Sequence, residues 1–494
     1  MSNRPETNKQ SCPVYKKCGG CQLQNLSYPE QLEFKQRKVE KLLKRFCTVE
    51  KIIGMKTPYH YRNKVQAAFY TDKKGKIISG VYQSGSHHVV GIDSCQTEDV
   101  IADKIIVAVR KLLPSFRMTT YNEDTGKGFL RHILVKRGFA TNQIMLVLVT
   151  GTPVFPSKNN FVKAILKQFP EITTVVQNIN PYRTNLVLGD NQKVLYGKGY
   201  IEDILCGCRF RISPKSFYQI NPVQTEVLYG KAIEFANLKG NETVLDTYCG
   251  IGTIGIIAAK NGAGNVIGAE LNGDAVRDAI VNARANNLKN IRFYKADAGE
   301  FMREAADEDE KPDVVFMDPP RAGSDRKFLD SLIKMSPKKV VYVSCNPETL
   351  ARNLAYLTQN SPYKAQKIQP VDMFPHTAHI ETVVLLSHKK ADSYIHIDVE
   401  FGEGEGKIPV DSIAKRAEAY KPKEKVTYKM IKEYIEAKYG FKVHTAYIAE
   451  VKRNLGLPMY DAPNAVEELK QPRKHPTPEK VEAIKDALRY FAVI

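Results

Sequence analysis

The feature that most constrains the fold of this chain is an alternation of short apolar runs and helical patterns between residues 208 and 387. Residues 243–245 are expected to form one strand, and a glycine turn then leads into a helical pattern at 253–260. Strands that alternate with helices are typical of parallel sheets covered on both faces. We therefore expect an α/β fold with a Rossmann-like, doubly wound parallel sheet. Its further strands are expected at residues 265–269, 313–317, 339–343 and 383–386, with a helix at 275–286.

The rest of the chain divides into three further parts. Residues 1–57 hold a cysteine-cluster segment and an amphipathic helix, expected at 28–47. Residues 58–207 hold short β-rich runs separated by turn residues, which predicts a central mixed α/β domain. Residues 388–494 predict an appended, mainly helical domain of unknown role. Central strands are expected at 66–70, 77–82, 143–149 and 173–177, and appended helices at 414–420, 426–436, 445–455 and 478–491.

The net charge of +19 lies almost entirely on the first 390 residues. Residues 391–494 hold 18 Lys and Arg against 17 Asp and Glu, which leaves an excess of 18 positive charges on residues 1–390. Such an excess indicates a polyanionic partner, because phosphates that are neutralised release condensed counterions. We find no basic amphipathic helix, no secretory signal and no apolar run of about 18 residues, so we expect nucleic acid rather than a membrane and a cytoplasmic location.

Three of the nine cysteines form a tight metal-binding pattern near the N-terminus. Cys12, Cys18 and Cys21 have a spacing that suits zinc or an iron–sulfur cluster, since soft thiolates bind both. A fourth ligand is needed, and Cys95 is the candidate because it follows a strand-like stretch in a polar loop. Cys47 is the competitor, but its helical pattern with apolar neighbours favours a place in the core.

A glycine-rich turn over residues 246–255 joins the first expected strand of the alternating region to its helix. Glycines there let the backbone approach a bound cofactor closely. Glu270 ends the next strand about 20 residues on, where an acidic side chain can bind a ribose diol. The same layout serves dinucleotides and S-adenosylmethionine, so the spacing leaves both open.

Two further strand ends carry reactive side chains. Asp318 is followed by two prolines and Arg321, which predicts a rigid loop that presents the carboxylate to the ligand crevice. The alternative is an aspartate that only caps the strand-to-helix turn. Cys345 directly follows the apolar run at 339–343 and precedes an Asn-Pro pair that breaks the strand. Taken alone, Cys345 is better explained as a small core residue than as a nucleophile.

Two other segments complete the candidate site. Residues 213–222 combine aromatic and polar side chains, which suits stacking on a base or an adenine as well as a simple linking turn. His376 and His379 are close enough in sequence to suggest a metal, although no third ligand lies nearby. Glu381 stands just before an apolar strand, where a charge is unfavourable unless it functions, so we interpret it as a general base.

Taken together, these motifs closely resemble the S-adenosylmethionine-dependent RNA (uracil-C5) methyltransferases, over residues 12–387. The cysteine set resembles the [4Fe–4S] site of the 23S ribosomal RNA branch of that family. The five motifs that carry the resemblance are residues 217–221, the turn 246–255, 318–321, 344–347 and 376–381.

The resemblance implies a role for each matching residue. Cys345 matches the nucleophile that adds to C6 of uracil, and Glu381 matches the base that removes the C5 proton. The expected partners are 23S ribosomal RNA and no DNA, and the chain is expected to be a monomer. Gln219, Tyr248, Glu270 and Asp318 match cofactor-binding positions, and Cys12, Cys18, Cys21 and Cys95 match the ligands of the [4Fe–4S] cluster.

Two departures from the family pattern concern how RNA is selected. Only eleven residues precede Cys12, where the family often has a β-barrel RNA-binding domain, and residues 388–494 are not part of the common pattern. Three alternatives stay open: a transfer-RNA uracil-C5 methyltransferase, an adenine amino-methyltransferase that needs no thiol, and a non-catalytic RNA-binding protein with a vestigial cofactor site.

Overall fold

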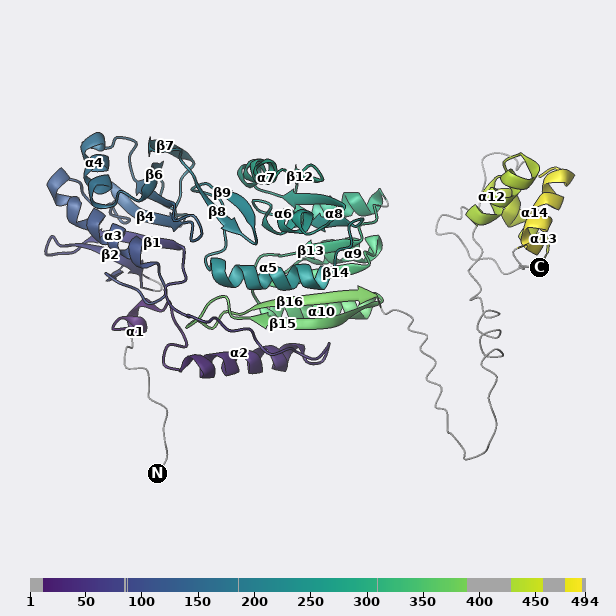
Figure 1. Ribbon diagram of the computed structural model, residues 1–494, viewed down its shortest axis with the longest axis horizontal. Coiled ribbons are helices and arrows are strands. Elements are labelled where there is room, and N and C mark those ends of the chain that lie inside the picture. The colour runs from purple at the N-terminus through teal and green to yellow at the C-terminus, as the bar shows by residue number, and fades with distance from the viewer. Residues whose placement is uncertain are drawn as a thin grey trace, which may run out of the picture. The chain divides into compact units, whose positions relative to one another are not determined.

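The computed structural model describes residues 12–83, 86, 88–184, 186–308, 310–388, 428–455 and 476–490. The chain forms two compact units, residues 1–393 and 394–494. Among the described residues no helix is long and apolar enough to cross a membrane. The first unit contains two seven-stranded sheets, which lie side by side in Figure 1 with a small hairpin between them.

The first sheet belongs to the central region and has the strand order β3-β2-β1-β4-β5-β6-β7. Only β5 and β6 pair in parallel, so the expected mixed α/β domain is confirmed. Helices α3 (Val100–Leu112) and α4 (Lys158–Gln168) pack on one face of this sheet, in a core with β1 and β4. The strands are β1 (Lys64–Thr71), β2 (Ile77–Tyr82), β3 (Val89–Gly91), β4 (Leu130–Arg137), β5 (Ile144–Thr150), β6 (Ile172–Ile179) and β7 (Asn191–Tyr196), and η1 (Pro114–Phe116) follows α3.

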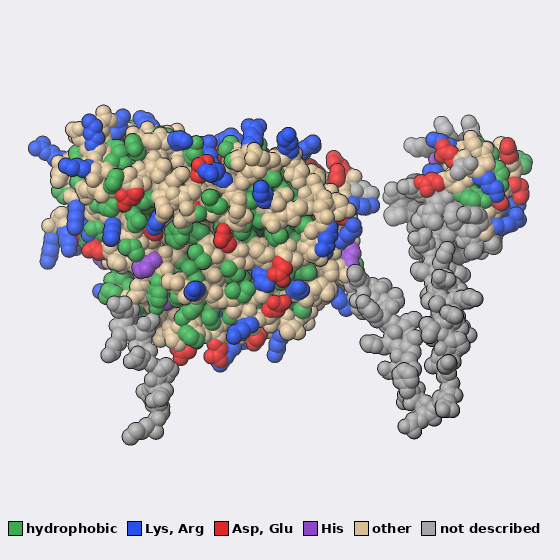
Figure 2. Space-filling view, in the orientation of Figure 1, with side chains coloured by type: hydrophobic (Ala, Val, Ile, Leu, Met, Phe, Trp, Pro, Cys, Tyr) green, Lys and Arg blue, Asp and Glu red, His purple; other side chains and the backbone are tan. Residues whose placement is uncertain are grey.

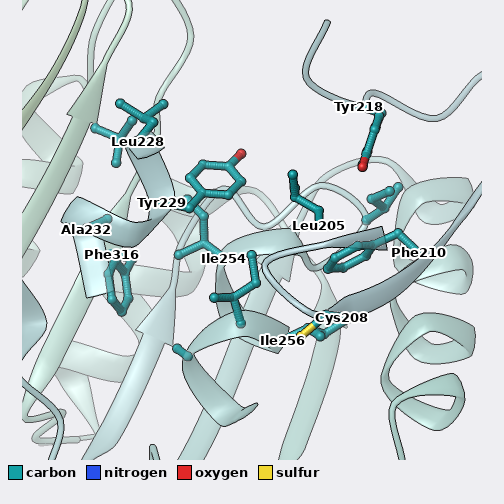
Figure 3. Packing of buried hydrophobic residues seen from close by; sticks show 14 of the residues in the cluster. Leu205, Cys208, Phe210, Tyr218, Leu228, Tyr229, Ala232, Ile254, Ile256 and Phe316 are labelled. Carbon is teal, nitrogen blue, oxygen red and sulfur yellow. The ribbon is translucent and has the colours of Figure 1, made fainter. Parts of the chain in front are cut away.

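The other face of this sheet packs against the hairpin β8 (Ile201–Leu205) and β9 (Cys208–Ile212). One apolar cluster contains Met145 and Val147 of the central sheet together with Phe210 of the hairpin. The same cluster continues through Tyr218 into the helices of the second sheet, as Figure 3 shows for Leu228, Tyr229 and Ile254. The two sheets therefore share a core, which fixes the loops between them.

The second sheet has the strand order β12-β11-β10-β13-β14-β16-β15. Five of its strands are parallel, as expected for a Rossmann-like fold, but β16 runs antiparallel to β14 and to β15. The prediction of a wholly parallel sheet was therefore wrong at this edge. Only residues 372–380 join β15 to β16, too few for the crossover of about a dozen or more residues that parallel pairing needs. The strands are β10 (Thr243–Asp246), β11 (Asn265–Glu270), β12 (Ile291–Lys295), β13 (Val314–Met317), β14 (Lys339–Ser344), β15 (Tyr363–Val371) and β16 (Glu381–His388).

Helices cover both faces of the second sheet, which is why its central strands are buried on both sides. Helices α5 (Pro222–Ala236), α6 (Thr253–Lys260) and α7 (Gly273–Ala285) share one apolar cluster with the sheet. Helices α2 (Tyr28–Leu43), α8 (Ala298–Asp307), α9 (Arg326–Met335) and α10 (Pro347–Asn360) share the other.

The N-terminal segment begins with α1 (Tyr15–Cys18) and continues into α2. The helix predicted over residues 28–47 ends at Leu43, so Cys47 is not helical, although it packs against the core cluster as expected. Cys47 is half-buried in the turn that follows, and its thiol donates to the carbonyl of Gln366 at 3.2 Å.

The second unit has helices at three of the four positions expected for the appended domain. They are α12 (Tyr428–Tyr439), α13 (Thr445–Asn454) and α14 (Pro478–Tyr490), around a small core that includes Ile435, Ile448 and Leu488. The helix expected at residues 414–420 lies outside the described residues.

Figure 2 shows Lys and Arg side chains spread over the visible face of the first unit rather than gathered in one patch.

Candidate active site

The candidate site lies at the carboxyl ends of β10, β13 and β14, where open α/β sheets bind ligands. Asp246 ends β10, Asp318 follows β13 and Cys345 follows β14. The antiparallel strand β16 enters at the same edge and begins with Glu381. Four reactive side chains from distant parts of the sequence therefore meet at one edge of the sheet.

Cys345 and Glu381 face each other across the β14–β16 pair. Ser344 pairs with Thr382, so the next residue on each strand places Cys345 opposite Glu381. The Asn346 side chain caps α10 by accepting from the Glu348 N–H at 3.1 Å, which turns the chain away directly after the thiol. Burial, with the added effect of Glu381 and Asp318 and against the opposing effect of Arg321, raises the pKa of Cys345 to about 11.

Glu381 is one of the most deeply placed acidic side chains of this edge, with a relative exposure of 4%. Burial raises the pKa of its carboxyl well above the ordinary value, and the neighbouring Asp318 adds to the effect, while Arg321 lowers it. Among the described residues Glu381 makes no side-chain hydrogen bond or ion pair. A carboxyl group held in this way is a stronger base than an ordinary glutamate once it is ionised.

Asp318 and Asp246 extend this poorly compensated acidic group. Burial raises the pKa of Asp318 to about 7, with Asp246 contributing. Burial likewise raises the pKa of Asp246 to about 7, although one of its oxygens accepts from the Gly255 N–H at 2.8 Å. The other oxygen of Asp246 is buried without a partner among the described residues. Such an edge disfavours negative charge and favours a cationic ligand.

One cavity of about 240 Å³ opens beside these groups and is lined by Gln219, Tyr248, Glu270 and Asp318. All four cofactor-binding candidates thus lie on a single cavity. The Glu270 carboxylate accepts from the Gly250 N–H at 3.1 Å and from the Asn272 N–H at 2.7 Å, which fixes it at the cavity wall. The Tyr248 hydroxyl lies 3.1 Å from the Ser324 hydroxyl.

The glycine turn shapes the floor of this cavity. Gly252 has φ +82°, and a Cβ there would lie 2.7 Å from the ring of Phe293, so no other residue fits without a shift. Cys249 is buried and also lines the cavity. Sequence reasoning missed Tyr229, which lines the cavity from α5 within 3.5 Å of the Gln219 amide. Its position among apolar helix residues carries no signal of a binding role.

The two histidines expected near the last strand do not share a site. His376 is buried, and its ring nitrogens lie 3.2 Å from the Gln31 amide and 3.0 Å from the Pro58 carbonyl. His379 lies instead at the active edge, with its Nε2 3.4 Å from the Arg321 guanidinium. His376 therefore anchors the loop, while Arg321, beside His379, acts by its charge on Cys345.

Cys12, Cys18, Cys21 and Cys95 line a second, small cavity. Burial raises the pKa values of Cys18 and Cys95, and it raises the pKa of Cys21 to about 12. Across the described part of the chain, no group of three or more His, Cys, Asp or Glu side chains could hold a metal ion. Of the other cysteines, Cys208 is buried and Cys206 is half-buried in the β8–β9 turn.

The chain matches a family model described as tRNA (Uracil-5-)-methyltransferase over residues 27–389. It is 43% identical over 388 residues to an uncharacterized RNA methyltransferase of Bacillus cereus, a match that covers 78% of this chain and 84% of the relative. It is 46% identical over 379 residues to another from Listeria monocytogenes, covering 76% of this chain and 83% of the relative.

Among solved structures, the chain is similar to the tRNA (uracil-54, C5)-methyltransferase of Pyrococcus abyssi, which was crystallised with S-adenosyl-L-homocysteine. The TM-score is 0.63 at 30% sequence identity, and the match covers 76% of this chain and 87% of the other.

Proposed function

We propose a covalent mechanism for this chain, which belongs to the tRNA (uracil-5-)-methyltransferase family and is an S-adenosylmethionine-dependent RNA (uracil-5-)-methyltransferase. The observation that carries the mechanism is the β14–β16 register, which sets Cys345 opposite Glu381. A thiol and a carboxylate that face each other this way are able to act on adjacent carbons of one pyrimidine ring.

The chemistry requires a nucleophile because C5 of uracil is too electron-poor to accept a methyl group directly. The Cys345 thiolate forms a bond to C6, and the electrons of the C5–C6 double bond move into an enolate. C5 then attacks the methyl group of S-adenosylmethionine, and the breaking carbon–sulfur bond leaves neutral S-adenosylhomocysteine. Glu381 takes the proton from C5, the double bond re-forms, and the thiolate is expelled. The target uridine must leave its stack to reach the thiol.

The local charges support a dependence of this chemistry on the methyl donor. Before ligands bind, the raised pKa values of Cys345, Glu381 and Asp318 favour their neutral forms. The sulfonium of S-adenosylmethionine is positive, so its arrival favours the anionic forms of all three groups. We infer that the thiolate and the base form when the donor is in place.

The cavity lining supports the assignment of Gln219, Tyr248, Glu270 and Asp318 to donor binding. Glu270 ends β11 at the position where an acid binds a ribose diol, and its carboxylate is held by two backbone N–H groups. Asp318 lies between this cavity and Cys345, so it is suited to contact the donor, the uracil edge or both.

For the substrate we favour a uridine of 23S ribosomal RNA, methylated in the cytoplasm. The four cysteines that line one cavity support this choice, because they resemble the iron–sulfur site of the ribosomal branch. Transfer RNA is the second candidate, since the similar Pyrococcus abyssi enzyme acts on tRNA. Both RNAs should be offered with labelled S-adenosylmethionine; exclusive labelling of transfer RNA would overturn our preference.

The mechanism is tested with RNA that contains 5-fluorouridine. Fluorine at C5 blocks the last elimination, so the wild-type chain should form a stable protein–RNA adduct in which Cys345 carries the nucleotide. Cys47→Ala is the matched control and should form the adduct normally, because Cys47 lies outside the site. Tight RNA binding without any adduct would point to a non-catalytic protein or to an amino-methyltransferase.

We propose further that Cys12, Cys18, Cys21 and Cys95 hold a [4Fe–4S] cluster. The proposal is supported by four thiols that line one cavity. A cluster distributes its thiolates over several irons, so they need not converge on one point. Such a cluster would tie the segment of α1 to the loop of Cys95. Anaerobically purified protein should be brown and lose that absorbance in Cys18→Ser, whereas stoichiometric zinc without iron would refute the cluster.

A further inference from the structure

Lys64, at the start of β1, stands directly opposite Lys136 of β4 in the central sheet. Partners in an antiparallel pair project from the same face, and like charges placed there destabilise a sheet. Burial, with a smaller effect from the positive charge of Lys64, lowers the pKa of Lys136 to about 7. Such an arrangement persists only if it is offset elsewhere, which makes the pair a candidate binding feature.

The two lysines differ in how their ammonium groups are satisfied. Lys136 is buried and donates to the Ser213 carbonyl at 2.9 Å and to the Ser216 carbonyl at 2.8 Å. Lys64 is half-buried and makes no side-chain hydrogen bond or ion pair with any described residue. Burial lowers the pKa of Lys64, and the positive charge of Arg62 lowers it further. Lys64 therefore has no anionic partner among the described residues, although it is partly buried and has cationic neighbours.

The segment that carries Lys64 is fixed between two parts of the active site. The Asn63 N–H donates to the Ile220 carbonyl at 2.9 Å, and the Asn63 amide donates to the Gln219 carbonyl at 3.2 Å. On the other side, the Tyr61 hydroxyl donates to the Pro375 carbonyl at 2.9 Å, in the loop that leads to Glu381. The backbone next to Lys64 is thus held against two segments of the site, while Lys64 itself is absent from the lining of the donor cavity.

We propose that Lys64 binds a backbone phosphate of the RNA next to the flipped uridine. This inference rests on the proposed function, because the anion is sought beside the site where the uridine would react. A phosphate oxygen supplies the missing counter-charge, and lysine binds phosphate as a point charge without reading sequence. The spread of cations in Figure 2 does not by itself locate the RNA, whereas an unpaired ammonium beside the site does.

The test compares RNA affinity of the full chain with that of Lys64→Gln over a series of salt concentrations. Loss of one phosphate contact on single-stranded RNA should reduce the slope of log affinity against log salt by about 0.7. Lys64→Arg should retain the wild-type slope. Lys104→Gln is the matched control, since Lys104 is exposed on α3, which packs on the opposite face of the sheet, and it should leave the slope unchanged.

Thermal stability separates a binding role from a structural one. Removing an unpaired, half-buried charge opposite Lys136 should leave the melting temperature of Lys64→Gln equal to or above that of the wild type, while a structural lysine would lower it. An unchanged slope would overturn the proposal, as would weaker S-adenosylmethionine binding with normal RNA binding, which would assign Lys64 to the donor carboxylate. Wild-type adduct formation with 5-fluorouridine RNA checks the proposed function independently, so the two failures are distinguishable.

Discussion

Two buried carboxylates lie at the two ends of one loop, and their surroundings differ: one is paired and hydrogen-bonded, and the other is not. Asp372, directly after β15, forms an ion pair with Lys35 at 2.6 Å, and both side chains are fully buried. The Tyr28 hydroxyl donates to its second oxygen at 2.9 Å. Glu381, at the other end of the loop, is also buried but makes no side-chain hydrogen bond or ion pair with the described residues.

The difference supports our proposal that Asp372 has a structural role and Glu381 a catalytic one. A buried charge is tolerated when it is paired and hydrogen-bonded, as Asp372 is. The group of Glu381, Asp318 and Cys345 lacks that compensation, and each member has a raised pKa mainly because of burial. Perturbed groups that share one edge of a sheet are typical of active sites. The loop is thus held by an ion pair at Asp372, and we propose that its other end places Glu381 at the substrate.

The largest effect is expected for Cys345→Ala. Without the thiol no bond to C6 forms, and we expect methylation of RNA to fall by about 10⁶-fold, the loss typical of a deleted nucleophile. The melting temperature should stay close to that of the wild type, since Cys345 is only half-buried. Labelled S-adenosylmethionine and differential scanning fluorimetry measure the two effects. Full activity in this variant would place the chain among methyltransferases that need no nucleophile.

Glu381→Gln should slow turnover by about 10²–10⁴-fold, the range expected for loss of a general base. Methyl transfer precedes proton removal, so the variant should accumulate a methylated Cys345–RNA adduct that denaturing gels and mass spectrometry detect. The stability of the protein should rise or stay constant, because a neutral amide replaces an unpaired buried carboxyl. Lost turnover without an adduct would show that Glu381 acts before the proton is removed.

Asp372→Asn should have the opposite effect: it should lower the free energy of unfolding and leave the rate of RNA methylation close to that of the wild type. Removing one partner of a buried ion pair leaves the Lys35 ammonium uncompensated, which costs about 3–5 kcal/mol. Urea unfolding of the variant measures this loss. The double variant Lys35→Met, Asp372→Asn is the control and should recover part of it. A stability equal to the wild type would mean that the compensated end of the loop is not the anchor.

A site residue could be predicted when the sequence pattern that indicates its position lies close to it in the chain. Asp318 and Cys345 each follow an apolar strand, and parallel strands end at one edge, so their meeting could be expected from the sequence. The antiparallel entry of β16 was not expected because no strand was predicted over residues 363–371, and without β15 the short connection that excludes parallel pairing could not be recognised. Lys64 carried no local signal either, since its conflict with Lys136 exists only in the β1–β4 register.

The smallest expected effect is the response of the Cys345 pKa to the charge of the bound donor. It tests directly whether the uncompensated end of the loop receives its missing charge from that donor. With a pKa raised to about 11, the thiol of the free protein should be alkylated by iodoacetamide more slowly at pH 8 than an ordinary cysteine, and the rate should climb with pH toward that value. An opposite charge within a few ångströms lowers such a pKa by about 1–3 units. S-adenosylmethionine should therefore speed alkylation of Cys345 at pH 8 by about tenfold or more relative to S-adenosylhomocysteine, which fills the same cavity without the positive charge.

Mass spectrometry of the peptide with Cys345 measures the rates, and any extra shielding by the methyl group works against the expected result. Equal rates with both ligands would mean that the charge missing around Glu381 and Cys345 is supplied by the RNA or by Arg321 rather than by the methyl donor.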